Sequence, residues 1–240
     1  MVWSTAGAGV ILWAAGEWLW PGAWFWAVLI LLVLVWGWSI AFFRDPKRQG
    51  TFSPNELCAP ADGRVADITE LETYAPIDGP AVRIGIFLGL CDVHINRSPC
   101  GGTVRSTTYR AGKFLAAMNP AAGEVNESNT MVLDAAPPIA GPVVVRQVAG
   151  MAARRIVCHA RERARLSIGE RFGLIKFGSR TELIVPKSAG MEVLVVVGDK
   201  VRAGLTVLMR CPLGSEKATG YERGSEDAAG IGAPAASAPA

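Results

Sequence analysis

The bond between Gly178 and Ser179 has the residue types that internal self-cleavage requires. A serine hydroxyl can attack the preceding carbonyl and turn the amide into an ester. Elimination from that ester then leaves a pyruvoyl group, which carries a ketone, in place of the serine. No metal ion or diffusible cofactor is needed for this chemistry. The dipeptide alone indicates little, because Gly-Ser pairs usually mark turns.

A serine nucleophile needs a base, and the base needs a group that orients it. His94 follows the apolar residues 82–88, at the point where a strand would open into a loop, and an imidazole titrates near neutral pH. Asp62 lies in a Pro-Ala-Asp-Gly sequence. Taken alone, such a histidine is typical of a surface or capping position and such an aspartate of a turn. Together with Ser179 they supply a nucleophile, a base and a carboxylate.

The N-terminal region differs in composition from the rest of the chain. All eight tryptophans lie within the first 38 residues, and no lysine or arginine precedes Arg44. Residues 23–43 contain no charged side chain. A helix of that length, at about 1.5 Å per residue, spans roughly 30 Å, the thickness of a bilayer's hydrocarbon core. These residues therefore predict a membrane-spanning helix.

A second apolar segment, residues 6–20, precedes this helix and contains Glu17. It is either a second, tightly fitting span or a re-entrant helix, with Pro21-Gly22 as the turn between the two. We therefore predict that residues 1–43 form a membrane-anchoring helical hairpin. A buried helix pair of a soluble protein is the less favoured alternative, because a small domain could hardly cover so many tryptophans.

Basic residues follow the predicted hairpin directly, at Arg44, Lys47 and Arg48. An excess of positive charge beside a span marks its cytoplasmic side, which places the following domain on the cytoplasmic face of the cell (inner) membrane. A secretory signal peptide would instead begin with basic residues and end at a small-residue cleavage site. Neither feature is obvious here.

The overall composition fits one domain of ordinary size plus a hydrophobic segment, since half of the residues are apolar and the net charge is +3. The five cysteines are odd in number and lack paired spacing, so they predict neither a disulfide framework nor a zinc site. With only two histidines, a metal cluster is not expected.

Beyond residue 51 the chain consists of short β-branched runs broken by Gly, Pro and Asp, as is typical of many short strands. Candidate strands cover residues 82–88, 143–148, 155–158, 183–185 and 191–197. A helix is expected only near residues 113–118. We therefore predict a mainly β catalytic domain over residues 44–212. Residues 213–240 are rich in Gly, Ala, Ser, Pro and Glu and are predicted to be a disordered tail.

Two turn sequences refine this fold prediction. Residues 197–204, Val-Gly-Asp-Lys-Val-Arg-Ala-Gly, resemble the tight turns between strands of biotinyl and lipoyl domains, and residues 59–65 have a related character. Those domains are flattened β-sandwiches of the barrel-sandwich-hybrid type, so we expect such a core here. Neither turn carries the lysine that those carriers modify, and a swinging-arm function is therefore not implied.

Several segments between residues 42 and 210 resemble, in order, those of short-form bacterial phosphatidylserine decarboxylase proenzymes. The matching segments are Phe42-Phe43-Arg44-Asp45-Pro46, Ala59-Pro60-Ala61-Asp62-Gly63, Asp92-Val93-His94-Ile95-Asn96-Arg97-Ser98-Pro99, Ala153-Arg154-Arg155-Ile156-Val157-Cys158 and Arg171-Phe172-Gly173-Leu174-Ile175-Lys176-Phe177-Gly178-Ser179-Arg180. Jointly they are very specific. The hydrophobic N-terminus also suits that family, whereas the C-terminal tail is outside the match.

The resemblance implies a self-processing carboxy-lyase, with Asp62, His94 and Ser179 at the positions of the family's self-cleavage triad. Ser179 would attack the carbonyl of Gly178, with His94 as general base and Asp62 as its orienting partner. β-Elimination and hydrolysis of the resulting dehydroalanine would leave a pyruvoyl group at position 179, the enzyme's covalent and self-derived cofactor. The products would be a larger chain, residues 1–178, and a smaller one, residues 179–240.

The implied reaction converts phosphatidylserine to phosphatidylethanolamine and CO2 through a Schiff base with the pyruvoyl group, which acts as the electron sink. His94, free after cleavage, is the candidate acid that returns a proton to the α-carbon. The expected partners are phosphatidylserine, an anionic phospholipid membrane, and the second self-cleaved chain in a heterodimer. Further oligomerisation stays open.

A basic stretch could meet the lipid phosphate or simply be a solvated strand face. It comprises Arg146, Arg154, Arg155, Arg161, Arg163, Arg165 and Arg171. Nucleic acid is not an expected partner, because few aromatic residues lie between these arginines.

Two other classes of function remain as alternatives. A noncatalytic, membrane-tethered β-sandwich adaptor would account for the turn sequences and the hydrophobic N-terminus. A membrane serine hydrolase would use Ser179, His94 and Asp62 for repeated turnover. Both alternatives predict that the chain stays whole.

Overall fold

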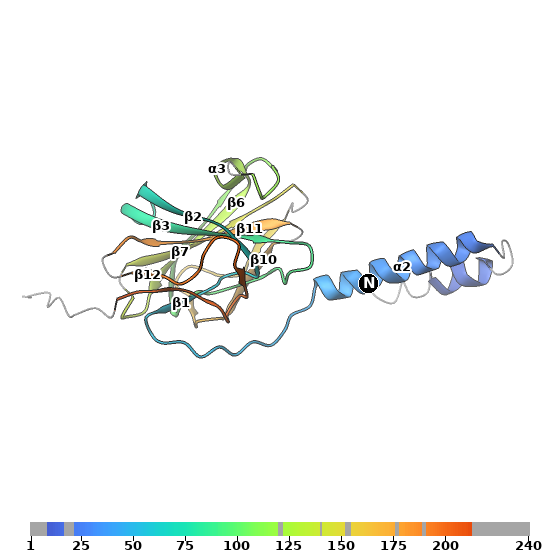
Figure 1. The fold of residues 1–240 in the computed structure, drawn as a ribbon, viewed down its shortest axis with the longest axis horizontal. Coiled ribbons are helices and arrows are strands. Elements are labelled where there is room, and N and C mark those ends of the chain that lie inside the picture. Colours follow the sequence, from blue (N-terminus) through green and yellow to red (C-terminus); the bar gives the residue numbers. More distant parts are fainter. Residues whose placement is uncertain are drawn as a thin grey trace, which may run out of the picture.

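A mainly β domain carries one long helix that projects from its side, as Figure 1 shows. The computed structural model describes residues 9–16, 22–119, 122–139, 141–151, 155–175, 178–188 and 191–212. The predicted mainly β, sandwich-like fold is confirmed. The predicted tail, residues 213–240, lies outside the described residues.

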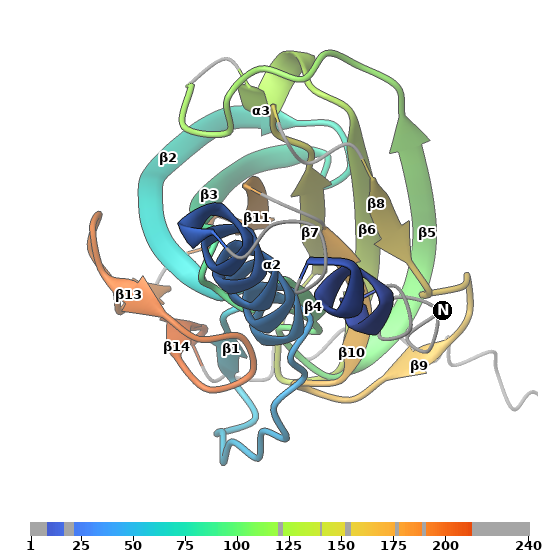
Figure 2. The same cartoon turned by 90° about the vertical axis from the view of Figure 1, so that its right-hand side faces the viewer.

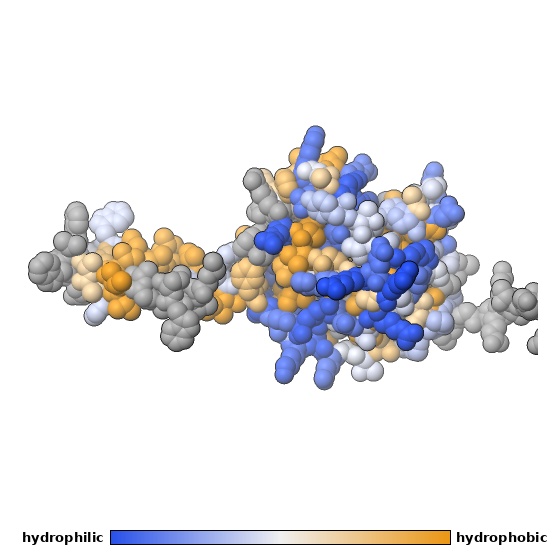
Figure 3. All heavy atoms as spheres, turned by 180° about the vertical axis from the view of Figure 1, so that it is seen from behind, coloured by the Kyte–Doolittle hydropathy of each residue, from blue (hydrophilic) through white to orange (hydrophobic). Residues whose placement is uncertain are grey.

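The projecting helix is α2 (Ala23–Phe42). Of the described residues, only those of this helix, Trp24–Phe42, form a stretch long and apolar enough to cross a membrane, and nearly all of it is exposed. Figure 3 shows the apolar colour along the helix and on the adjoining part of the β domain, whereas the rest of that face is mostly hydrophilic. Arg44 caps the C-terminal end of α2, because its Nη1 donates to the Ala41 carbonyl at 2.7 Å. The negative end of the helix dipole favours a cation at this position.

Residues 9–16 are also helical and lie beside the outer part of α2 (Figure 1). The turn predicted at Pro21-Gly22 and the charged Glu17 fall largely outside the described residues, which resume at Gly22. The hairpin as a membrane anchor therefore stays a prediction.

The strands within the described residues form three antiparallel sheets. The eight-stranded sheet has the order β13 (Lys200–Val201), β2 (Gly63–Tyr74), β3 (Gly79–Leu88), β11 (Ser179–Pro186), β7 (Pro142–Val148), β6 (Ser128–Ala135), β5 (Gly102–Arg110) and β9 (Arg165–Leu166). One three-stranded sheet has the order β1 (Glu56–Cys58), β14 (Val207–Arg210) and β12 (Glu192–Val193). The other has the order β4 (Ile95–Arg97), β10 (Arg171–Ile175) and β8 (Ile156–Cys158).

The large sheet curls strongly, and Figure 2 shows β2 and β3 bending around the domain while β5 and β6 stand on the other side. The main hydrophobic core lies on its inner face, where residues such as Ile84, Leu133 and Phe172 are buried. The smaller sheets contribute Leu57, Leu208 and Phe172 to this core, which makes the domain sandwich-like.

The prediction of a helix near residues 113–118 is wrong. Lys113 forms a bridge with Asn126 instead, and the Asn126 side chain accepts from the Leu115 N–H and donates to the Leu115 carbonyl, both at 2.9 Å. These tertiary hydrogen bonds satisfy backbone groups that a helix would pair internally. The short helix α3 (Ala122–Val125) forms a few residues later. Of the strand predicted over residues 191–197, only β12 (Glu192–Val193) is observed.

β11 is a central strand, paired with β3 on one side and β7 on the other. Leu183 and Val185 belong to the main core, whereas Ile184 belongs to a smaller cluster on the opposite face. Because side chains alternate along a strand, Ser179 lies on the core-facing side and Arg180 on the other. The serine is thus placed inside the domain.

The opposite face of β11 carries a buried ionic network. Glu182 is fully buried and accepts from Arg180 Nε at 2.8 Å and from Arg146 Nη1 at 3.4 Å. Arg180 also donates from Nη2 to Asp67 on β2 at 2.8 Å. A Cβ at Gly85 would meet the Arg180 guanidinium at 2.1 Å, so the glycine makes room for this side chain. The network ties β11 to β2 and β7.

Replacing Glu182 with alanine should destabilise the fold by about 3–5 kcal/mol, because two buried arginines lose a shared carboxylate. Glu192→Ala is the matched control; its pair with Arg210 is exposed and should be worth about 0–1 kcal/mol. Urea unfolding of the detergent-solubilised protein, followed by circular dichroism, measures both free energies. Equal losses in the two variants would refute a structural role for the network.

Candidate active site

The Gly178–Ser179 bond lies at the start of β11, where Ser179 pairs with Leu88 of β3. Gly178 has φ +59°, in the left-handed region that glycine adopts without a Cβ penalty. Ser179 is 0% exposed, and its Oγ has no hydrogen-bond partner within the described part of the chain. The hydroxyl is thus buried and uncommitted beside the carbonyl that it would attack.

Gly150 packs against that carbonyl. An ideal Cβ built on Gly150 would lie 1.9 Å from the Gly178 oxygen and 3.3 Å from the Ala117 Cβ. Gly150 follows β7, the strand that pairs with β11, so the approach is fixed by the sheet. Only a residue without a side chain leaves the Gly178 carbonyl in this position.

His94 lies between a turn and β4, and its ring is oriented by the backbone. Nδ1 is 2.8 Å from the Asp92 carbonyl oxygen, which can only accept a hydrogen bond. Nδ1 therefore carries the proton in the neutral ring, and Nε2 holds the free lone pair. Nε2 is buried and has no partner among the described residues. This is the tautomer that a general base needs.

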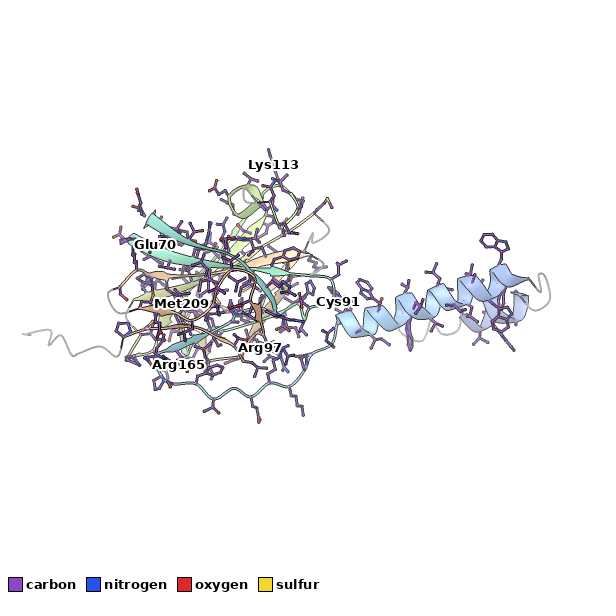
Figure 4. All side chains as sticks on the ribbon, in the orientation of Figure 1. Glu70, Cys91, Arg97, Lys113, Arg165 and Met209 are labelled. Carbon is purple, nitrogen blue, oxygen red and sulfur yellow. The ribbon has the colours of Figure 1, made fainter. Side chains whose placement is uncertain are left out.

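The end of α2 covers this histidine. The Phe42 ring packs on the imidazole with centroids 4.4 Å apart, and Arg44 Nη2 donates to the Cys91 carbonyl at 2.7 Å. Figure 4 shows Cys91 beside the end of the helix. Burial lowers the pKa of His94 from its ordinary value of 6.5, while hydrogen bonding to Asp92 and the charges of Asp92 and Asp62 oppose the shift. The lowered pKa keeps the His94 ring uncharged at neutral pH, so the Nε2 lone pair is available.

His94 and Ser179 are held in the same part of the domain by their strands. The Ile175 N–H, at the end of β10, donates to the His94 carbonyl at 3.2 Å. Asn96, two residues after His94, donates to Thr181 Oγ1 at 3.0 Å, and Thr181 is two residues after Ser179. Gln147 of β7 donates to the Asn96 oxygen at 2.9 Å. This buried polar network fixes β4 against β11.

Asp62 does not contact His94 through a hydrogen bond. Its carboxylate accepts both ends of the Arg48 guanidinium, with Nη2 to Oδ2 at 2.7 Å, and the Ala203 N–H at 2.8 Å. The Asp92 carbonyl makes the orienting contact that was expected of Asp62. Asp62 acts on His94 through its charge, which favours the protonated ring.

Sequence reasoning missed Phe42, Arg48 and Gly150 as parts of this site. Phe42 belongs to a matching segment, but nothing local shows that its ring lies on a histidine far along the chain. In the sequence, Arg48 is only one of the basic residues that indicate membrane topology. Gly150 has an ordinary Ala-Gly context, and its importance comes from a contact across the sheet.

The predicted basic stretch is not one surface. Arg146 is buried beside Glu182, whereas Arg155, Arg161, Arg163 and Arg165 are exposed. Arg154 lies outside the described residues. Arg171 on β10 pairs with Asp45, directly after the helix.

Comparison with known proteins identifies the chain. A family model described as phosphatidylserine decarboxylase matches residues 37–209, which contain every candidate site residue. Three relatives carry the name phosphatidylserine decarboxylase proenzyme. The one from Magnetococcus marinus is 40% identical over 188 residues (78% of this chain, 84% of the relative). Those from Rhodopirellula baltica and Salinibacter ruber are 41% identical over 202 residues (84% and 81%) and 42% over 198 residues (81% and 86%).

The fold, the site and these matches define an enzyme of the carboxy-lyase class. The chain belongs to the phosphatidylserine decarboxylase family. The predicted resemblance is thereby confirmed.

Gly150→Ala should abolish or strongly slow any reaction at the Gly178 carbonyl, because the new Cβ would lie inside the contact distance of that oxygen. Gly79→Ala is the control, since a Cβ there meets nothing within 4 Å. The fraction of cut chain on a denaturing gel measures the effect. Normal cutting in the Gly150 variant would show that this carbonyl is not the reacting group.

Phe42→Ala should raise the pKa of His94 toward 6.5, because water would reach a ring that burial now keeps neutral. As the pH is lowered, His94 of the variant should become protonated sooner. Any rate that needs the neutral ring should therefore begin to fall at a higher pH than in the wild type. NMR titration of histidine-labelled protein measures this, with His159 as the second signal and internal reference. An unchanged His94 titration would contradict the role given to Phe42.

Proposed function

We propose that this chain is a phosphatidylserine decarboxylase that converts Ser179 into a pyruvoyl group by cutting its own Gly178–Ser179 bond. The observation that carries the proposal is the buried, unpartnered Ser179 hydroxyl directly after a left-handed glycine. Family membership supports decarboxylation of phosphatidylserine, which is named in the relatives. The word "proenzyme" in the names of these relatives implies that their chains are processed.

The first step would be attack of Ser179 Oγ on the Gly178 carbonyl carbon. His94 Nε2 would take the hydroxyl proton, and the amide nitrogen would leave with a proton, so that an ester replaces the peptide bond. Loss of the Ser179 α-proton then breaks the Cβ–Oγ bond and frees Gly178 as a carboxylate. The dehydroalanine left behind tautomerises and takes up water, releasing ammonia and leaving a pyruvoyl group.

The surroundings of Ser179 fit this conversion. Its Oγ has no partner among the described residues, so no hydrogen bond is lost when the oxygen departs with Gly178. The ion pairs of Arg180 with Asp67 and Glu182 would hold the new chain end in β11. The pyruvoyl carbonyl supplies an electron sink for the electrons released with CO2. His94, carrying a proton on Nε2, would return it to the α-carbon of the substrate.

The fold explains how two chains would stay together as a heterodimer. Residues 179–240 would contain β11, which pairs with β3 and β7 of the larger chain. They would also contain β13 and β14, paired with β2 and β1. A cut at position 178 therefore removes one bond and leaves the sheets intact.

We place the protein at the cell membrane, with residues 1–43 as the anchor, residues 44–212 as the cytoplasmic catalytic domain and residues 213–240 as a tail. The apolar α2 and the basic residues after it support this arrangement. Because Phe42 touches His94, the site would lie next to the lipid surface from which the substrate comes. A serine hydrolase is disfavoured, because the relatives are named decarboxylase proenzymes, whereas a hydrolase would keep Ser179 in an uncut chain.

Ser179→Ala and His94→Ala should each accumulate as a single uncut and inactive chain of 25.4 kDa, because one lacks the nucleophile and the other the base. Ser188→Ala, at an exposed position outside the site, should cut normally. Denaturing gels measure cutting, and CO2 release from vesicles containing phosphatidylserine measures activity. Efficient cutting of His94→Ala would remove His94 from the base role.

A further inference from the structure

A basic pocket lies beside the segment that leaves α2. It has a volume of about 470 Å³ and is lined by Lys47, Arg48, Gln49, Arg97, Glu170 and Arg171. Figure 4 shows Arg97 on the part of the domain next to this segment. None of these side chains performs a step in the proposed self-cleavage.

Two arginines of the pocket are direct neighbours across strands. Arg97 of β4 pairs in register with Arg171 of β10, an arrangement that like charges make unfavourable. The Asp45 carboxylate lies between them, with Oδ1 2.9 Å from Arg171 Nε and 3.4 Å from Arg97 Nη2. A single carboxylate thus holds two guanidinium groups at a point where an anionic group is favoured.

With Arg48 paired to Asp62, the three other cations of the pocket face two carboxylates, Asp45 and the exposed Glu170, whose Oε2 accepts the Ser167 N–H at 2.7 Å, so one positive charge is left over. Arg97 is buried and donates to the Gly169 and Pro46 carbonyls at 2.9 and 3.1 Å, so its position is fixed. Arg48 is committed to Asp62. Lys47 is exposed and forms no ion pair within the described residues, and Arg171 uses only its Nε. The lysine ammonium and the Arg171 Nη groups are therefore available to a ligand.

Desolvation and the charges of Arg171 and Arg48 together lower the pKa of Arg97, and the nearby carboxylates only partly oppose this. Arg97 and Arg171 therefore lie close enough for their charges to oppose each other. A phosphate oxygen would relieve the repulsion while accepting several charge-assisted hydrogen bonds.

The pocket lies near the expected lipid surface. α2 ends at Phe42, and Lys47 follows five residues later, so the two are within about 18 Å even in a fully extended chain. The polar layer of a bilayer extends several ångströms beyond the hydrocarbon core on each side, roughly 5–8 Å. Lys47 would therefore meet headgroup phosphates where the β domain lies against the membrane surface.

We propose that this pocket binds the phosphate group of an anionic phospholipid headgroup and so holds the β domain against the membrane surface. The proposal rests on the membrane attachment proposed above, but not on self-cleavage or decarboxylation. Lys47 and Arg171 would donate to the phosphate, with Arg97 fixed behind them by its backbone contacts.

Native mass spectrometry of the detergent-solubilised full-length protein tests this directly. The probes are phosphatidylglycerol, which is anionic but has no amine to react, phosphatidylcholine, and inorganic phosphate. Phosphatidylglycerol should bind at least about tenfold more tightly than phosphatidylcholine. Lys47→Gln, which breaks no ion pair among the described residues, should weaken phosphatidylglycerol binding about fivefold. The double variant Lys47→Gln with Arg171→Gln should weaken it about 30-fold, because each basic residue near the membrane contributes roughly 1 kcal/mol.

The matched control is Lys113→Gln with Arg165→Gln, which removes the same charge from two exposed positions that do not line the pocket; Figure 4 labels both residues. Binding to this variant should stay within about twofold of the wild type. Equal losses in the two double variants would show diffuse attraction and overturn the proposal, as would no loss in either. Displacement of the lipid by millimolar inorganic phosphate would assign the pocket to a free anion instead. The same spectra show whether the chain is cut, so failure of the proposed processing is seen separately.

Discussion

The packing of Phe42 on His94 joins the apolar helix to the reactive part of the β domain. It buries the imidazole, which lowers its pKa, while the Asp92 carbonyl fixes the proton on Nδ1. The result is a neutral ring with a free lone pair on Nε2, enclosed in the protein. Because the covering residue is the last of α2, the same contact sets the distance between the site and the end of the helix. The Arg44 contact with Cys91 reinforces this junction.

The candidate cleavage bond lies at the edge of a stable strand rather than in an open loop. Gly178 takes the left-handed conformation, and Ser179 enters β11 between two partner strands. The reacting groups are therefore positioned by the sheet, with Gly150 against the carbonyl and the Asn96–Thr181 hydrogen bond between the two strands that carry His94 and Ser179. Burial would also exclude bulk water from the proposed ester intermediate, which hydrolysis would otherwise cut before elimination.

The features that depend on a local sequence pattern could be predicted. The uncharged run of α2, the β-branched strands such as β3 and β7, and the Gly-Ser pair could all be found without a structure. His94 and Asp62 could be picked as candidates by residue type and position, and the family segments implied their roles. Contacts between distant segments could not be found in this way. The helix expected near residues 113–118 is replaced by hydrogen bonds from Asn126, and the contact expected of Asp62 is made by the Asp92 carbonyl. Phe42 and Gly150 act across the fold, where a single sequence gives no signal.

The central claim is that Ser179 reacts once as a hydroxyl and thereafter works as a ketone. Accurate mass measurement of the purified wild-type protein tests it most directly. The account predicts two chains, the smaller beginning at position 179 and lighter by one ammonia than a serine-terminated chain of the same sequence. Its N-terminus should resist Edman degradation and react with a hydrazine. A single intact polypeptide, or a smaller chain with an unmodified N-terminal serine, would contradict the account.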